Sequence, residues 1–262
     1  SSLYFDLSKS DKNSFKKADC CWICRQDFTE DNTKVKDHDH MTGTYRGAAH
    51  NKCNINLNYE RWKVPVIFHN FKGYDSNFIV QAMNEKITNI SIIPLNTEKF
   101  MTVSFLKLQF IDSLNFLNES LDTLVENLKK SNGVDSFKVL QQEYKHCTKD
   151  QIALLLRKGV YPYEYMDSFD RFNETSLPPK EKFYSTLKLQ EISDKDYDHA
   201  SNVWKSFNMK TMRDYHDLYL KLDVILLADV WCNFRSICLN NDGLEPSTFV
   251  SLPSYSLNNL LQ

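Results

Sequence analysis

Residues 21–24 read CWIC and residues 50–53 read HNKC, and the run DHDH fills positions 37–40 between them. In each flanking stretch the first and last residues are Cys or His, and this spacing lets both side chains reach one ion from a single turn. Four such ligands close a tetrahedral zinc site, which stabilises the fold because no position is left for a substrate. The predicted zinc ligands are Cys21, Cys24, His50 and Cys53.

The cysteine content favours a metal site over a set of disulfides. The chain has seven cysteines, and four of them lie within the first 53 residues. An odd count without a secretory signal fits a disulfide framework poorly. One alternative stays open, because Cys20 also has a usable spacing to Cys24 and could replace Cys21.

The DHDH run is not needed for zinc and indicates a second site. Oxygen atoms of Asp and Asn suit Mg²⁺, which prefers hard ligands. A neighbouring His could take a proton from water for attack on a phosphodiester. The alternative is a solvated Asp-His repeat with no chemical role.

The segments CWIC and KVKDHDHMTGTYRGAAHNKCN resemble the zinc-supported ββα-metal (HNH-like) nucleases of the recombination endonuclease VII type. The resemblance implies that Asp37 and Asn54 bind a catalytic Mg²⁺ or Mn²⁺. It also implies that His38 is the general base and that His40 assists at the phosphate. One departure is Leu57, which stands where the family often has an acidic residue.

Two further motifs, HNFKGYD at residues 69–75 and YLKLD at residues 219–223, resemble the second and third exonuclease motifs of family B DNA polymerases. Taken singly, Asp75 could be a helix N-cap and Tyr219 a core residue. Their order and spacing favour a shared site, since Tyr219 and Asp223 are four apart on one helix face. The residues that the resemblance places in the proofreading site are Asn70, Asp75, Tyr219 and Asp223.

Three other segments resemble the protein-primed branch of these polymerases that is found in Maverick or Polinton elements and related viruses. They are FIDSL at residues 110–114, KGVYPYEYMD at residues 158–167 and LPPK at residues 177–180. In that branch an endonuclease VII-like module sits inside the exonuclease domain. The resemblance implies DNA as the partner, branched or single-stranded, and a terminal-protein-like partner. It also implies a location in the nucleus or at a viral or transposon replication site.

Several motifs of a complete polymerase are not found. Asp6 is the sole candidate for the first exonuclease motif, and Ser8 stands where its Glu is expected, so we interpret residues 4–8 as the lead-in to the zinc module. No Tyr-x-Asp-Thr-Asp and no Ser-Leu-Tyr-Pro occurs. We therefore expect a fragment or a truncated copy without polymerase activity.

Hydrophobic periodicity predicts the remaining elements. Strands are expected at residues 64–69, 90–95, 99–105 and 106–112, the last two as a hairpin. Helices are expected at residues 76–84, at 150–158, where Gly159 would end the helix, and at 194–207, and the pattern is mainly helical from residue 120 onward. Residues 211–240 are expected as one long helix or a closely spaced pair, whose apolar positions would face a core: Leu218, Leu222, Ile225, Leu226 and Trp231. Residues 159–182 are expected as an ordered loop. The predicted class is α/β (α+β): an RNase H-like, exonuclease-type sheet with helices at residues 63–262, and the zinc module at residues 1–62.

Composition excludes some functions. Glycine is scarce, with six residues, and neither GxGxxG nor a phosphate-binding GxxxxGK[ST] loop occurs. No apolar run reaches the roughly 18 residues of a membrane helix, and the first residues lack a signal-peptide pattern. We therefore expect an intracellular protein with no membrane partner.

The leading hypothesis is a metal-dependent DNA endonuclease that hydrolyses phosphodiester bonds on a residual exonuclease scaffold. A homodimer would suit an enzyme that cuts both strands. One alternative is a non-catalytic remnant that binds DNA or protein. The other is the 3′–5′ proofreading region of a longer DNA polymerase whose first motif and palm are absent here. The intact DHDH run together with Asn54 favours the endonuclease.

Overall fold

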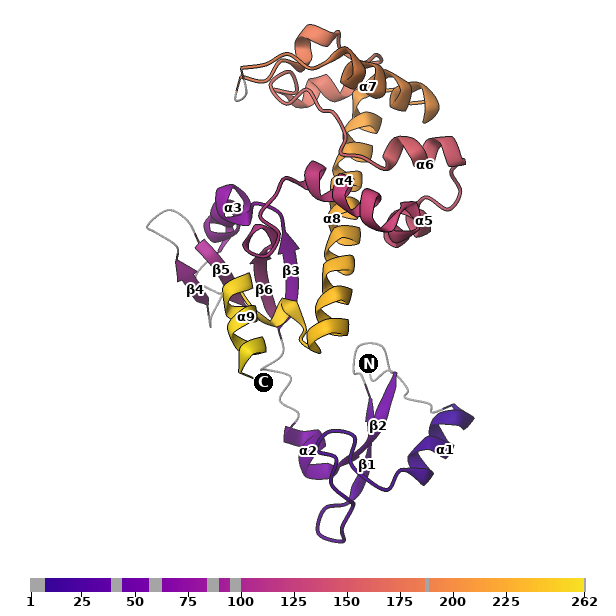
Figure 1. Ribbon diagram of the computed structural model, residues 1–262, viewed down its shortest axis with the longest axis vertical. Coiled ribbons are helices and arrows are strands. Elements are labelled where there is room, and N and C mark those ends of the chain that lie inside the picture. The colour runs from indigo at the N-terminus through magenta and orange to yellow at the C-terminus, as the bar shows by residue number, and fades with distance from the viewer. Residues whose placement is uncertain are drawn as a thin grey trace. The chain divides into compact units, whose positions relative to one another are not determined.

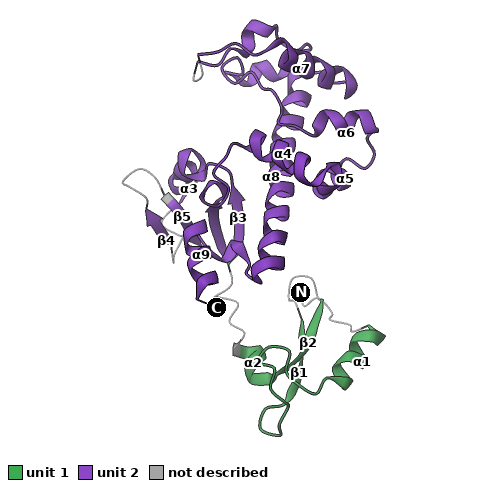
Figure 2. Cartoon of the chain, in the orientation of Figure 1, with its two compact units in different colours: residues 1–64 green, residues 65–262 purple. Residues whose placement is uncertain are grey.

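The computed structural model describes residues 8–38, 44–56, 63–83, 90–94, 100–186 and 189–261. The chain divides into two units, residues 1–64 and residues 65–262 (Figure 2). Two sheets are described, one of two strands and one of four, and both are accompanied by helices. This mixture confirms the predicted α/β (α+β) class.

Unit 1 contains a β-hairpin followed at once by a short helix (Figure 1). Its elements are α1 (Lys9–Lys17), β1 (Lys34–His38), β2 (Tyr45–His50) and α2 (Asn51–Asn56). The strands are antiparallel, with Lys34 opposite His50 and Asp37 opposite Gly47. The register shifts between Asp37 and His38, an irregularity that locally re-aims side chains.

Helix α1 is an element that the sequence analysis did not predict. The Ser8 side chain accepts a hydrogen bond from the Asp11 backbone N–H at 3.1 Å, and the Asp11 carboxylate accepts one from the Ser8 backbone N–H at 3.3 Å. This reciprocal pair is a capping box, which satisfies N–H groups that a helix start leaves unpaired. Its sequence signal, a Ser followed three residues later by an acidic residue, was available.

The second sheet has the order β3-β6-β5-β4. Its strands are β3 (Val64–Phe68), β4 (Ser91–Pro94), β5 (Phe100–Phe105) and β6 (Leu108–Asp112). The predicted hairpin is present, because β5 and β6 pair antiparallel up to Phe105 opposite Leu108. Leu106 takes the left-handed conformation in its turn, with φ of 51°. A Leu in the place where Gly or Asn is usual explains why the turn is unmarked in the sequence.

The helices of unit 2 are α3 (Asp75–Ala82), α4 (Leu121–Asn132), α5 (Lys138–Glu143), α6 (Lys149–Leu155), α7 (Asp194–Ser206), α8 (Met212–Asp242) and α9 (Leu252–Leu260). Most lie where periodicity predicted them. The predicted end of α6 at Lys158 is wrong, because the helix stops at Leu155. Gly159 lies beyond the helix and allows a close approach to Tyr219, because a Cβ at this position would come within 2.7 Å of the Tyr219 ring.

Helix α8 joins three hydrophobic clusters along its length. Near its start, Met212 and Tyr215 pack in a cluster with α7. In its middle, Leu222 and Leu226 pack with α4 and α5. Towards its end, Trp231 packs with residues of β6 and α9, and Figure 1 shows this helix running past the sheet. The predicted buried face of the helix is therefore confirmed.

A buried carboxylate on α8 holds the start of α5. Asp229 is 1% exposed, and its two oxygens accept hydrogen bonds from the backbone N–H groups of Val139 at 2.8 Å and Leu140 at 3.0 Å. Burial raises the pKa of Asp229, and these two N–H groups act against that rise. The carboxylate supplies the cap that α5 lacks from its own N-cap residue, Phe137.

Candidate metal centre and nuclease site

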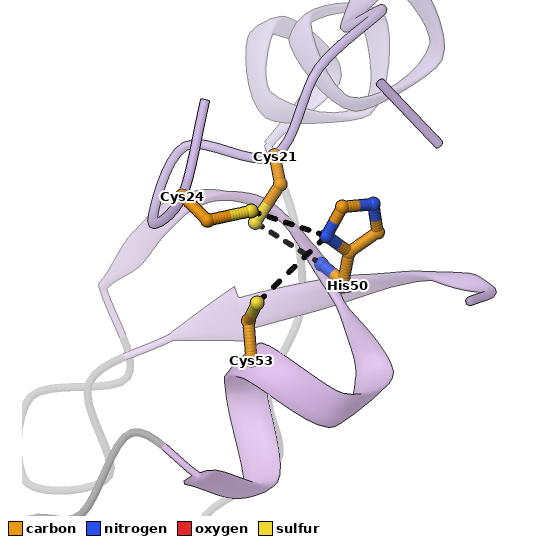
Figure 3. A group of neighbouring side chains, drawn as sticks. All are labelled: Cys21, Cys24, His50 and Cys53. Carbon is orange, nitrogen blue, oxygen red and sulfur yellow. Dashed lines mark hydrogen bonds between the residues drawn. The ribbon is translucent and has the colours of Figure 1, made fainter. Parts of the chain in front are cut away.

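Four side chains from three segments of unit 1 meet in one cluster (Figure 3). Cys21 and Cys24 precede the hairpin, His50 ends β2 and Cys53 lies in α2. Their ligand atoms all lie within 4.8 Å of one another. The Sγ atoms of Cys24 and Cys53 are 3.3 Å and 3.7 Å from His50 Nδ1. The cluster contains Cys21 and not Cys20.

The His50 ring is oriented to present one nitrogen to the sulfur atoms. Its Nε2 lies 2.9 Å from the backbone carbonyl oxygen of Asp27, which can only accept, so Nε2 carries the proton. Nδ1 is then left with a lone pair directed at the cluster. A carbonyl partner of this kind is typical of metal-binding His. Three thiolates and one imidazole are a donor set that fits a structural zinc ion.

The thiols differ in how readily they ionise. Burial raises the pKa of Cys21, but the N–H groups of Cys24, His50 and Ile23 outweigh it and lower that pKa to about 7. Burial raises the pKa of Cys53 to about 11, with Cys24 and the negative charge of Cys21 adding to the rise. A divalent cation among the sulfurs would relieve this mutual repulsion, so the electrostatics also suit a metal ion.

Asp37 is buried and hydrogen-bonded through both of its carboxylate oxygens. It is 2% exposed. Its Oδ2 accepts hydrogen bonds from Trp22 Nε1 and Arg46 Nε, both at 3.0 Å, and its Oδ1 accepts one from Arg46 Nη2 at 2.6 Å. The two bonds from Arg46 form a bidentate ion pair, a strong and directional contact. Of these three hydrogen bonds Oδ1 accepts one, so an ion that binds Asp37 would approach Oδ1 beside Arg46.

Two other predicted catalytic residues of unit 1, His38 and Asn54, lie on different elements. His38 ends β1 directly after the register shift and lies opposite Tyr45. Asn54 is half-buried in α2. His40, and Leu57 where the family often has an acidic residue, lie outside the described residues, as does Asp6. The catalytic roles of these side chains stay predictions.

In unit 2, two of the predicted exonuclease residues line one cavity of about 670 Å³. Asp75 comes from the start of α3 and Asp223 from α8, and His69 and Lys158 line the same cavity. Lys158 Nζ lies 3.5 Å from Asp223 Oδ2. Burial raises the pKa of Asp223, and the charge of Lys158 opposes that rise. Burial also raises the pKa of Asp75.

Asn70 is not among the residues that line the cavity. It has a φ of 68°, and its backbone N–H donates to Asp112 Oδ1 at 3.0 Å. Its side chain lies against Gly73, where a Cβ would come within 2.6 Å of Oδ1. Asp112 is fully buried and also accepts from the Lys72 backbone N–H at 3.2 Å. Asp112 therefore shapes the loop that carries the motif, a role that the sequence analysis missed.

Tyr219 is buried beside the cavity rather than in its wall. Its ring stacks on Tyr161 with centroids 4.7 Å apart, and its hydroxyl is hydrogen-bonded to the Tyr163 hydroxyl. Burial raises the pKa of Tyr219, and the nearby charge of Asp223 adds to this. The structure thus brings Asp75 and Asp223 to one cavity, while Asn70 and Tyr219 support the segments around it.

The two units differ in their capacity for metal. Within the described parts of the chain, the Cys3His cluster is the one group of three or more Cys, His, Asp or Glu close enough to hold an ion. The cavity in unit 2 offers two carboxylates next to an ammonium group. Those residues by themselves do not fit a pair of divalent ions, which need more carboxylate ligands.

The family model described as DNA polymerase type B, organellar and viral, matches residues 55–260, which is more than half of the chain. The chain belongs to this family. The model described as recombination endonuclease VII matches residues 4–63. No similar chain was found among curated proteins or among solved structures.

Both predicted resemblances are therefore confirmed. The organellar and viral type B polymerase match spans the two exonuclease-like motifs, and the endonuclease VII match spans the Cys3His cluster. The two matches meet at residues 55–63, near the boundary between the units. In the described part of this polymerase-family chain, no helix is long and apolar enough to cross a membrane.

Proposed function

We propose that unit 1 is a zinc-supported, metal-dependent DNA endonuclease that hydrolyses phosphodiester bonds and is carried by a type B polymerase-like unit. One observation carries the proposal: the Cys3His cluster joins a β-hairpin to the helix that follows it, with Asp37 and His38 at the end of β1. The match to recombination endonuclease VII over the same residues supports it.

The proposed roles follow the chemistry of the side chains. Zinc at the four-ligand cluster is structural, because all four ligands come from the protein. Asp37 and Asn54 supply the oxygen atoms that Mg²⁺ or Mn²⁺ prefers, and such an ion would stabilise charge on the phosphate. His38 is the base that takes a proton from the attacking water, and His40 assists at the phosphate. DNA, branched or single-stranded, is the proposed substrate.

The test is cleavage of supercoiled plasmid and of a branched junction by the full chain, with Mg²⁺ or Mn²⁺. His38→Ala removes the proposed base and should abolish cleavage. Asp223→Ala is the matched control, because it changes the cavity in unit 2 and should leave cleavage intact. If zinc-loaded wild-type protein cuts neither substrate, the proposal fails. If Asp223→Ala is inactive while His38→Ala is active, the nuclease is in unit 2.

A second candidate function is 3′–5′ exonuclease activity in unit 2. It is favoured by Asp75 and Asp223, which line one cavity with Lys158. The ammonium group of Lys158 could pair with a phosphate, but the cavity needs further carboxylates that the described residues do not supply. Digestion of a 5′-labelled single strand that depends on Asp75 and Asp223, and not on His38, would support this candidate.

A further inference from the structure

Trp22 lies between two of the cluster ligands, Cys21 and Cys24. Its backbone N–H donates to the carbonyl oxygen of Ala48 in β2 at 2.9 Å, so the loop that carries the ligands is attached to the hairpin. Because both neighbouring ligands would be bound to the same ion, zinc would fix the backbone of Trp22 from both sides.

The Trp22 ring extends from this loop across the hairpin. It covers Gly47, where a Cβ would come within 2.7 Å of the ring carbons Cδ1 and Cγ. Gly47 is opposite Asp37 in the strand register. The glycine therefore allows the ring to approach, and the indole Nε1–H reaches Asp37 Oδ2 at 3.0 Å.

We propose that Trp22 is a positioning residue that couples the zinc cluster to Asp37. Arg46 and Trp22 share Asp37 Oδ2, and Arg46 alone binds Oδ1. Trp22 is thus the contact through which the ligand loop holds the carboxylate. When zinc fixes the loop, the indole fixes Oδ2; when zinc is lost, the loop no longer holds the indole against Asp37. The role of Asp37 as ligand of the catalytic ion rests on the proposed function, but the coupling itself does not.

The coupling can be observed by NMR without any cleavage assay. The chain has four tryptophans, so ¹⁵N labelling of tryptophan gives four indole N–H signals, and Trp22→Phe identifies one of them by its loss. In the zinc-loaded full chain, Asp37→Asn should shift the Trp22 signal and leave the signal of Trp204, which packs on Tyr215 in unit 2, unchanged. Removal of zinc should move the Trp22 signal to the position of a solvent-exposed indole.

Cleavage measures the consequence for the proposed active site. Trp22→Phe keeps the ring over Gly47 and removes the N–H donor, so zinc content should stay at one ion per chain. The Mn²⁺ concentration for half-maximal cleavage should rise about 10-fold, as is typical when a partner of a metal ligand is lost. Trp204→Phe is the matched control and should leave the Mn²⁺ dependence unchanged.

The outcomes separate this inference from the proposed function. A Trp22 signal that does not respond to Asp37→Asn overturns the coupling. An unchanged Mn²⁺ dependence in an active Trp22→Phe variant overturns the role of Trp22 in positioning Asp37 as a ligand of the catalytic ion. If zinc-loaded wild-type protein cuts no DNA, the endonuclease proposal fails. The NMR comparison then still decides whether Trp22 holds Asp37.

Discussion

At the scale of single residues, buried carboxylates hold distant backbone segments in place, and hydrophobic periodicity does not predict these contacts. Asp112 and Asp229 each accept backbone N–H groups from segments far away in the sequence. A sequence pattern shows which residues share a face of one element, but not which distant N–H group will lie beside them. The same limit applies to Trp22, whereas the four residues of the Cys3His cluster could be predicted because each of its two pairs has a local spacing, with two residues between the ligands.

Removing the Asp229 carboxylate tests its role at the start of α5. Asp229→Ala leaves two buried N–H groups without partners, so the free energy of unfolding should fall by about 1–3 kcal/mol. Asp229→Asn keeps one acceptor oxygen and should lose less. Urea denaturation measures both variants. Equal stability of Asp229→Ala and wild type would contradict the assigned cap.

The stability of unit 2 should depend on the protonation of His199. Burial, and after it the charge of Arg157, lowers the pKa of His199 from 6.5 to about 4. Between these values the unfolded chain binds a proton that the folded chain does not. The contribution of neutral His199 to the free energy of unfolding is therefore fully present above pH 6.5, and it is lost as the pH falls towards 4. Melting temperatures measured across this range should decline less steeply in His199→Gln; parallel curves would show that His199 does not contribute.

At the scale of elements, helix and strand positions followed from periodicity, while their ends depended on tertiary contacts. Helix α6 ends three residues before Lys158, and Gly159 beyond it makes a close contact with the Tyr219 ring. The β5–β6 hairpin was predicted from its strands alone, since its turn contains Leu106 in a conformation that leucine rarely adopts.

The turn at Leu106 offers a stabilising substitution. Leucine at positive φ is strained, and its side chain is 67% exposed, so little burial would be lost on replacement. Leu106→Asn should raise the free energy of unfolding by about 0.5–1 kcal/mol, because Asn tolerates this conformation. Leu106→Ala keeps the strain and is the control in the same urea titration. Equal effects of the two variants would show that the gain does not come from the backbone.

At the scale of the whole molecule, the two units differ in what stabilises them. The described residues of unit 1 include three buried apolar side chains, Cys21, Ala48 and Ala49, all small. The four hydrophobic clusters that the structure describes are built from residues of unit 2. The described residues of unit 1 therefore supply little apolar core, and we expect its fold to depend on a metal ion at the Cys3His cluster.

Zinc removal should consequently unfold one unit and spare the other. A chelator strong enough to strip zinc should remove the unfolding transition of unit 1 from the calorimetric profile and make unit 1 sensitive to protease. Unit 2 should melt unchanged. Cys53→Ser should reproduce the effect without chelator. If both units lose stability together, the metal cluster supports more of the chain than unit 1.

The three clusters along α8 also restrict how this chain can change length. One inserted residue turns the rest of a helix by about 100° and moves it by about 1.5 Å. An insertion after Leu226 would therefore leave the first two clusters in place and turn Trp231 away from its partners in β6 and α9. Insertions and deletions should be tolerated in the connecting loops and selected against within α8, so this helix should keep a constant length as the sequences of related chains diverge.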